Sequence, residues 1–174
     1  MPDRLTAAVS VTPLPAAARF SLRVAGAERS RFEDALRESL PPGIGGVAGT
    51  PERFIACLGP DEWQLTVPLT DAAAAREAIR ALPPDLPCSV TDIGARELCY
   101  LVQGPQAATL LNAGCPRNLP AMPVPSAART VFDGTPVTLV KWNETVFRLE
   151  IWRSFAPHML ACLDLARRDI FELE

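Results

Sequence analysis

The chain has 174 residues, enough for one domain or for two small halves packed together. Its hydrophobic fraction of 48% and charged fraction of 21% are those of an ordinary globular protein and exclude a disordered chain. With 17 basic and 20 acidic residues the formal net charge is -3, and no basic cluster is longer than Arg167-Arg168. A nucleic-acid partner is therefore not expected.

The N-terminal stretch is predicted to be an extended arm over residues 1–16. It carries Asp3 and Arg4, and Pro13 and Pro15 interrupt its apolar part, so it has the pattern of neither a signal peptide nor a membrane span. Five cysteines at irregular spacing favour free buried thiols over a disulfide framework. This cysteine usage indicates a reducing compartment, and we expect a cytoplasmic protein.

A first α+β half is predicted over residues 17–94. Period-two alternation indicates strands, steps of three and four indicate helices, and the pairs Pro41-Pro42 and Pro83-Pro84 stop the helices. The expected elements are a strand at 20–24, a helix at 32–40, strands at 53–58 and 63–67, a helix at 71–82 and a strand at 88–93. This order is ferredoxin-like, an antiparallel sheet with helices on one face.

The glycine-rich run 43–49 is predicted to be a flexible connection. Residues 43–48 satisfy G-x-G-x-x-A, one form of the dinucleotide fingerprint. That motif needs a strand before it and a helix after it, so that the helix N-terminus meets the pyrophosphate. Here a helix precedes and a strand follows, so dinucleotide binding is not expected.

A second α+β half is predicted over residues 95–174, and together with the first it gives one compact unit. Its expected elements are a strand at 98–102, a short helix opened by Pro105, a proline-rich loop at 115–125, strands at 129–132, 137–142 and 145–152, and a helix at 154–169. Gly114 is expected to close the short helix in a left-handed cap. The hairpin at 142–149 resembles that at 58–65, which makes an internal duplication plausible.

The pattern over residues 145–152 predicts a strand with one buried and one solvent-exposed face, because Phe147, Leu149 and Ile151 alternate with Arg148 and Glu150. The helix after it has one apolar face, formed by Phe155, Met159, Cys162, Leu163 and Ala166.

The corner between this strand and helix carries Trp152 and Phe155. We interpret these two side chains as core anchors. The alternative is a site role, and Trp152, Arg153 and Phe155 are the candidate partner-binding residues.

No stretch of the sequence assembles a convincing active site. The cysteines contain no C-x-x-C pair and there is no H-x-x-x-H, so metal binding is poorly supported. His158, the only histidine, is placed by its helical phase at the boundary between core and water, where we interpret it as an edge residue with a partner. The acidic residues Asp61, Glu62 and Glu144 fall in turns, where solvation explains them. We therefore expect no catalytic, cofactor-binding or metal-binding residue in this chain.

Several segments resemble the gamma subunit of heterotetrameric sarcosine oxidase over roughly residues 50 to 170. The most specific is FRLEIWRSFA, because a Trp-Arg-Ser-Phe corner is not required by generic packing of a strand on a helix. The segments are LGPDEW at 58–63, LLNAGCP at 110–116, RTV at 129–131 and FRLEIWRSFA at 147–156.

This resemblance implies a fold similar to the folate-binding aminomethyltransferase domain and a non-catalytic role. In that family the complex oxidatively demethylates sarcosine to glycine, makes hydrogen peroxide and passes a one-carbon unit to tetrahydrofolate. The resemblance implies alpha, beta and delta subunits as partners, with the FAD, FMN, NAD and tetrahydrofolate sites in the larger subunits.

Two rival functions stay open. The first is an autonomous folate-binding or aminomethyltransferase-like module, although Gly94 stands where related folate domains usually have the serine of Asp-x-Ser. The second is the small subunit of a sister complex such as N-methylglutamate dehydrogenase, which only the substrate of the assembly distinguishes.

Overall fold

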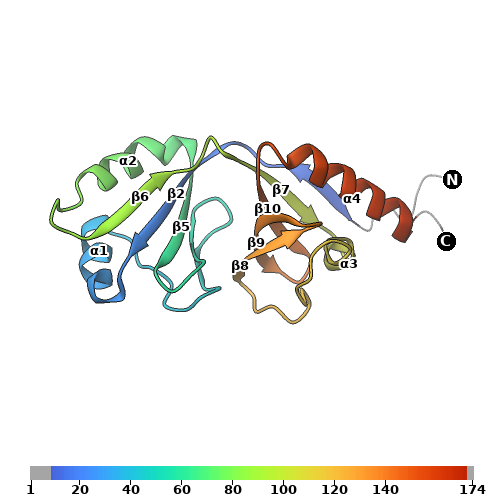
Figure 1. Ribbon diagram of the computed structural model, residues 1–174, viewed down its shortest axis with the longest axis horizontal. Coiled ribbons are helices and arrows are strands. Elements are labelled where there is room, and N and C mark those ends of the chain that lie inside the picture. The colour runs from blue at the N-terminus through green and yellow to red at the C-terminus, as the bar shows by residue number, and fades with distance from the viewer. Residues whose placement is uncertain (1–8, 172–174) are drawn as a thin grey trace. The chain divides into compact units, whose positions relative to one another are not determined.

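The structure, a computed structural model, describes residues 9–171. The described chain divides into two compact units (Figure 1). The first unit is Ala16–Ala95, and the second contains residues 96–171 together with residues 9–15. Each unit is an α+β structure with its own antiparallel sheet and its own hydrophobic core, as the sequence predicted.

The first unit contains a five-stranded sheet in the order β3-β4-β5-β2-β6. Both of its α-helices pack on one face of the sheet, because the inward residues of helices and strands form one apolar cluster that includes Phe20, Phe32 and Leu65. The elements are β2 Ala17–Val24, η1 Gly26–Glu28, α1 Arg29–Leu36, β3 Val47–Gly49, β4 Phe54–Cys57, β5 Glu62–Pro68, η2 Leu69–Asp71, α2 Ala72–Arg80 and β6 Cys88–Asp92.

The glycine-rich run differs from the expected flexible connection. Its last residues form β3, and the backbone before β3 exchanges two hydrogen bonds with Cys57, whose carbonyl accepts from Gly45 N over 2.8 Å and whose N–H donates to Gly46 O over 2.9 Å. The helix before the run ends at Leu36 rather than at Leu40, since Arg37 is left-handed with φ 58. Backbone pairing therefore fixes a segment that composition alone describes as loose.

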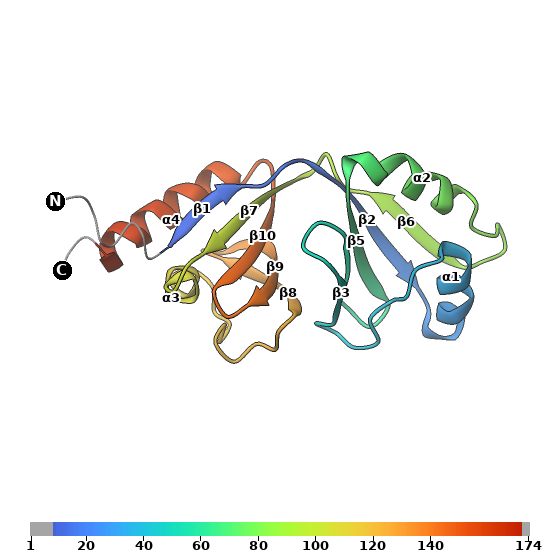
Figure 2. The ribbon, with the colours of Figure 1, turned by 180° about the vertical axis from the view of Figure 1, so that it is seen from behind.

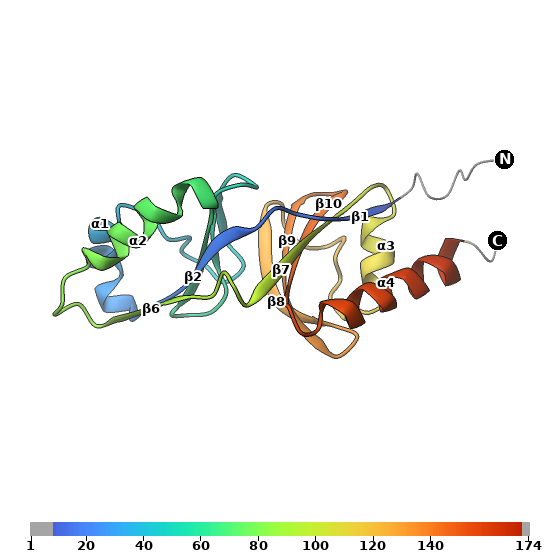
Figure 3. The ribbon, with the colours of Figure 1, turned by 90° about the horizontal axis from the view of Figure 1, so that it is seen from above.

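The second unit contains a five-stranded sheet in the order β1-β7-β10-β9-β8. The helices α3 and α4 contact each other and pack on one face of this sheet, around a cluster that includes Leu110, Leu149 and Met159 (Figure 3). The elements are β1 Ser10–Pro13, β7 Glu97–Gln103, α3 Ala107–Asn112, β8 Ser126–Phe132, β9 Thr135–Asn143, β10 Val146–Trp152 and α4 Ala156–Phe171.

The two sheets repeat one strand order. Across the first sheet the strands lie in the order β6-β2-β5-β4-β3, and across the second in the order β1-β7-β10-β9-β8, so β2 corresponds to β7 and β5 to β10. The corresponding strands also follow one another in the same order along the chain, except for β6 and β1. The edge strand that corresponds to β6 comes from the N-terminal side of the chain: β1 pairs antiparallel with β7, with Ser10 opposite Gln103 (Figure 2). The arm expected over 1–16 is therefore held as a strand at 10–13, and residues 1–8 lie outside the described residues.

The face of β10 that carries Arg148 and Glu150 is buried, so the prediction that this face is exposed to solvent was wrong. The side chains of Arg148 and Glu150 are 5% and 1% exposed, and Arg148 Nε donates to Glu150 Oε1 over 2.8 Å. Buried charges are tolerated when they pair and bond one another. The alternation predicted the strand correctly, but it cannot distinguish solvated charges from paired buried ones.

The proline-rich loop is held against β9 by a buried ammonium group. Lys141 is fully buried, and its Nζ donates to three loop carbonyls, those of Leu119 at 3.2 Å, Pro120 at 3.3 Å and Met122 at 3.0 Å. The same Nζ lies 2.8 Å from Glu144 Oε2. An ammonium has three N–H donors, which are shared here among the three carbonyls and the carboxylate, so one side chain ties the loop to β9.

Candidate functional site

The corner between β10 and α4 is a hydrogen-bonded turn. The N–H of Phe155 donates to the carbonyl of Trp152 over 2.9 Å, and the N–H of Arg153 donates to the carbonyl of Arg96 over 2.8 Å. The second bond continues the pairing of β10 with β7, in which Trp152 stands opposite Glu97. The sequence motif Trp-Arg-Ser-Phe thus forms a backbone-fixed platform at the end of a central strand.

The two aromatic rings of this corner are exposed, so their interpretation as core anchors is wrong. Trp152 is 44% exposed and Phe155 is 40% exposed, and their ring centroids are 6.2 Å apart at an interplanar angle of 34°. Backbone hydrogen bonds fix the turn of the corner, and the apolar residue buried beside it is Ala156, which is 1% exposed. The rings therefore form an accessible aromatic patch, as the alternative site role requires.

A guanidinium group completes the patch. The Cζ atom of Arg96 lies 5.0 Å from the centroid of the Trp152 ring, and Arg96 also donates to Glu97 Oε1 over 2.9 Å. Such a cation–π contact contributes about 0.5–1 kcal/mol at an exposed position. Sequence reasoning missed Arg96 because it is more than fifty positions from Trp152 and meets it only through the pairing of β7 with β10. We call Arg96, Trp152, Arg153 and Phe155 the aromatic corner.

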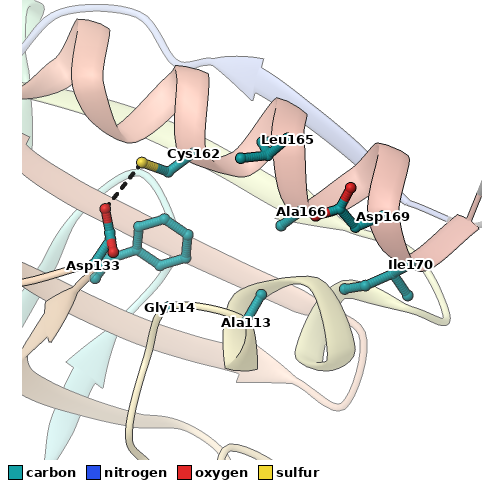
Figure 4. A pocket seen from close by; sticks show the side chains of 9 residues that line it. Ala113, Gly114, Asp133, Cys162, Leu165, Ala166, Asp169 and Ile170 are labelled. Carbon is teal, nitrogen blue, oxygen red and sulfur yellow. Dashed lines mark hydrogen bonds between the residues drawn. The ribbon is translucent and has the colours of Figure 1, made fainter.

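A second group of polar side chains lies where α4 passes the turn between β8 and β9. Asp133 Oδ2 is 3.0 Å from His158 Nε2 and accepts a hydrogen bond from the Cys162 thiol over 3.1 Å. Cys162 Sγ is 3.7 Å from His158 Nε2. In the part of the chain that the structure describes, these three residues are the one group whose donor atoms converge as metal ligands do. Figure 4 shows the thiol pointing toward the carboxylate.

The sequence contained a signal for part of this group. His158 and Cys162 are four positions apart, which places both side chains on one stripe of a helix. The motif search considered C-x-x-C and H-x-x-x-H but not the mixed H-x-x-x-C. Asp133 was not predictable in this role, because it reaches α4 from a turn 25 residues earlier in the chain.

The carboxylate changes the acidity of the thiol. The hydrogen bond from the Cys162 thiol to Asp133 raises the pKa of Cys162, since it stabilises the protonated form, and partial burial and the negative charge of Asp133 act in the same direction. This cysteine is therefore a protonated thiol near neutral pH.

The fold is shared with a solved structure of low sequence identity. Aminomethyltransferase T of the glycine cleavage system from Bartonella henselae superposes with a TM-score of 0.68 at 17% identity, covering 96% of this chain and 51% of that chain. No protein-family model matches the sequence. The chain is thus an α+β protein with the aminomethyltransferase-like fold.

Two more specific matches concern sarcosine oxidase. Sarcosine oxidase subunit gamma of Corynebacterium sp. (strain P-1) is 33% identical over 128 residues, which span 72% of this chain and 62% of that subunit. A chain of heterotetrameric sarcosine oxidase from Corynebacterium sp. U-96 superposes with a TM-score of 0.83 at 28% identity, covering 92% of this chain and 84% of that chain. The chain is therefore similar in sequence to a sarcosine oxidase gamma subunit, of whose length the match spans 62%, and similar in fold to a chain of heterotetrameric sarcosine oxidase.

Among residues 9–171, none of the helices is both long enough and apolar enough to cross a membrane.

Proposed function

We propose that the chain is a non-catalytic gamma subunit that supports the assembly of a flavin-dependent sarcosine oxidase. The observation that carries the proposal is the superposition of 92% of the chain on one chain of a heterotetrameric sarcosine oxidase. In this proposal the partners are alpha, beta and delta subunits, and the FAD, FMN, NAD and tetrahydrofolate sites lie in the larger subunits. The complex demethylates sarcosine to glycine oxidatively, with release of hydrogen peroxide and transfer of the one-carbon unit to tetrahydrofolate.

The aromatic corner is the surface we propose for contact with a partner subunit. Exposed tryptophan and arginine side chains are the residue types most enriched among residues that dominate binding energy at interfaces. Trp152 and Phe155 expose apolar rings while the backbone turn holds them in place, so ordering them in an interface costs little entropy. A chain of a heterotetrameric sarcosine oxidase superposes on 92% of this chain, which supports a shared mode of assembly.

Co-expression tests the proposal. The chain, with a cleavable tag, is produced together with the presumed alpha, beta and delta subunits and purified through the tag. We expect the larger subunits and flavin absorbance to elute with it. Recovery of this chain alone, without flavin colour, would contradict the subunit assignment.

The surface is tested separately with a double variant. Trp152→Ala with Phe155→Ala should reduce recovery of the larger subunits at least tenfold, with the melting temperature of the isolated chain nearly unchanged, because both side chains are exposed. Leu69→Ala is the matched control, since Leu69 is an exposed apolar residue of the first unit at 58% exposure. If the double variant assembles as well as this control, the aromatic corner is not the contact surface.

A second candidate function, folate binding by the isolated chain, has the fold match to aminomethyltransferase T as its support. The local geometry at Gly94 weighs against it. A Cβ atom at this position would lie 3.2 Å from the carbonyl oxygen of Ala17 and 3.3 Å from the N atom of Arg19, so a serine there would be crowded. Titration of the isolated chain with tetrahydrofolate distinguishes the two functions, because saturable binding would favour the folate module.

A further inference from the structure

We propose that Asp133, His158 and Cys162 bind a divalent transition-metal ion of the zinc class. The three residues offer one oxygen, one nitrogen and one sulfur donor, and these atoms lie within 4.8 Å of one another. The proposal concerns this chain alone and does not depend on the assembly proposed above. We call the three residues the D-H-C cluster.

The spacing of the three donor atoms approaches that of a tetrahedral zinc site. Zinc bond lengths of about 2.0–2.3 Å and tetrahedral angles place neighbouring donor atoms about 3.4–3.6 Å apart. The distance between Cys162 Sγ and His158 Nε2 is 3.7 Å, close to this range, whereas Asp133 Oδ2 is 3.0 Å from the nitrogen and 3.1 Å from the sulfur. An ion therefore needs the carboxylate oxygen to move outward by about half an ångström.

The scaffold limits how far two of the ligands can move apart. His158 and Cys162 are separated by one turn of α4, a 16-residue helix that packs through Met159 and Leu163 on the core. Asp133 and Gly134 form a two-residue turn between β8 and β9, with φ of 45 and 74, the left-handed pair typical of a tight hairpin. The N–H of Asp133 donates to Gly114 O over 2.9 Å. The backbone positions of the three ligands are thus set before any ion binds.

The chemistry of the donors indicates which ions fit. A thiolate and an imidazole favour zinc and its neighbours in the transition series over magnesium and calcium, which prefer oxygen ligands. Binding breaks the S–H bond of Cys162, the thiolate sulfur donates its electron pair to the ion, and the proton leaves to solvent. The imidazole of His158 donates as the neutral base, so the site carries two negative charges against the two positive charges of the ion.

There is an entry path and space for a fourth ligand. The side chains of His158 and Asp133 are 54% and 55% exposed, so an ion reaches them directly from solvent. A pocket of about 290 Å³ opens beside Asp133 and Cys162, with Phe132 and Leu165 in its wall (Figure 4). Three protein ligands and an open position are typical of zinc sites that keep an exchangeable water.

Cobalt(II) titration of the full chain, with any affinity tag removed and the protein treated with chelator, tests the proposal. We expect saturation at one equivalent, with visible bands of four-coordinate cobalt and a near-ultraviolet thiolate-to-cobalt charge-transfer band. Zinc should bleach both and magnesium should not. Absence of a saturable band at one equivalent would overturn the proposal.

Variants assign the ligands. Cys162→Ser should abolish the charge-transfer band, and His158→Ala should weaken cobalt affinity by at least about tenfold. Asp133→Asn should weaken it as well, and asparagine tolerates the left-handed turn conformation. Cys88→Ser is the matched control, because Cys88 is a half-buried thiol in the first unit. A charge-transfer band that survives in Cys162→Ser, or that is lost in Cys88→Ser, would refute the assignment, and thermal melts of each variant verify that it is folded.

Discussion

Arg148 and Glu150 face one another two positions apart on β10, joined by a bond of 2.8 Å between Nε and Oε1, and both are buried. Pairing with the opposite charge is one of the interactions that make each charge tolerable there. Replacement of one residue alone, as in Arg148→Met or Glu150→Gln, removes this bond while the other charge stays buried. We expect a loss of about 3–5 kcal/mol in the free energy of unfolding, measured by urea denaturation.

The double variant Arg148→Met with Glu150→Leu is the control for this pair. Replacing a whole buried ion pair by apolar residues of similar volume is frequently neutral or stabilising. We expect the double variant to be more stable than either single variant. If the effects of the two sites simply add, the pair is not energetically coupled.

The hydrogen bonds of Lys141 are expected to stabilise the proline-rich loop. Lys141→Met removes the donor from the carbonyls of Leu119, Pro120 and Met122, and we expect a loss of about 1–3 kcal/mol in the free energy of unfolding. Proteolytic cleavage should become faster in the loop. The control is Glu144→Gln, since the Glu144 side chain is 73% exposed and should lose less than about 1 kcal/mol. Equal effects of the two variants would show that the carbonyl bonds are unimportant.

Gly114 is required by packing rather than by the left-handed cap that the sequence suggested. It is absent from the residues with positive φ, and a Cβ atom there would lie 2.9 Å and 3.0 Å from two ring carbons of the buried Phe132. We expect Gly114→Ala to cost about 1–3 kcal/mol in a denaturation experiment. Gly26→Ala is the control, because nothing lies within 4 Å of its added methyl group, and it should be neutral. An unchanged midpoint for Gly114→Ala would show that Phe132 moves freely.

The raised pKa of Cys162 predicts that the stability of the fold and the reactivity of this thiol depend on pH. Its pKa is raised in the folded state by the bond to Asp133, so the thiol contributes stability that is complete below the unfolded pKa of about 8.5 and is lost as the pH rises through the folded pKa. Alkylation by iodoacetamide near pH 8.5 should be slower at Cys162 than at a cysteine in an unfolded peptide. Mass spectrometry of the labelled peptides gives both rates.

Asp133→Asn should accelerate that alkylation, because the carboxylate that stabilises the protonated thiol is gone. Cys88 is the internal reference. Burial raises the pKa of Cys88 and Asp133 is not among the causes, so its rate should not change. If Cys162 is alkylated at the same rate in the Asp133→Asn variant as in the unchanged protein, another group controls the reactivity of the thiol.

The local elements of the fold were predictable because the signals for them are local. Alternation gave the β10 strand, and helical spacing gave α2 and α4 to within a few residues. The pairing of β1 with β7 was not predictable from one sequence, because Ser10 and Gln103 are 93 positions apart and nothing in either segment specifies the other. The left-handed end of α1 at Arg37 was missed for a related reason, since the proline pair downstream gave the stronger stop signal.

The candidate sites show where polarity patterns fail. The alternation of β10 treats charge as a mark of solvent, whereas Arg148 and Glu150 are buried. The interpretation of Trp152 as a core anchor came from its large apolar side chain, whereas that side chain is exposed. The motif of the aromatic corner was visible in the sequence, but its guanidinium neighbour Arg96 required the sheet register. The expectation that His158 has a partner was correct, although its side chain is 54% exposed rather than at the boundary between core and water, and only the structure identifies that partner as Asp133.

Lys141 is the single lysine of the sequence, and its ammonium group is fully enclosed. Reagents that acylate or cross-link primary amines therefore find no reactive side chain on the folded surface of residues 9–171. Labelling that appears at Lys141 under native conditions would report the opening of the loop above it, which makes this residue a built-in chemical probe of that motion.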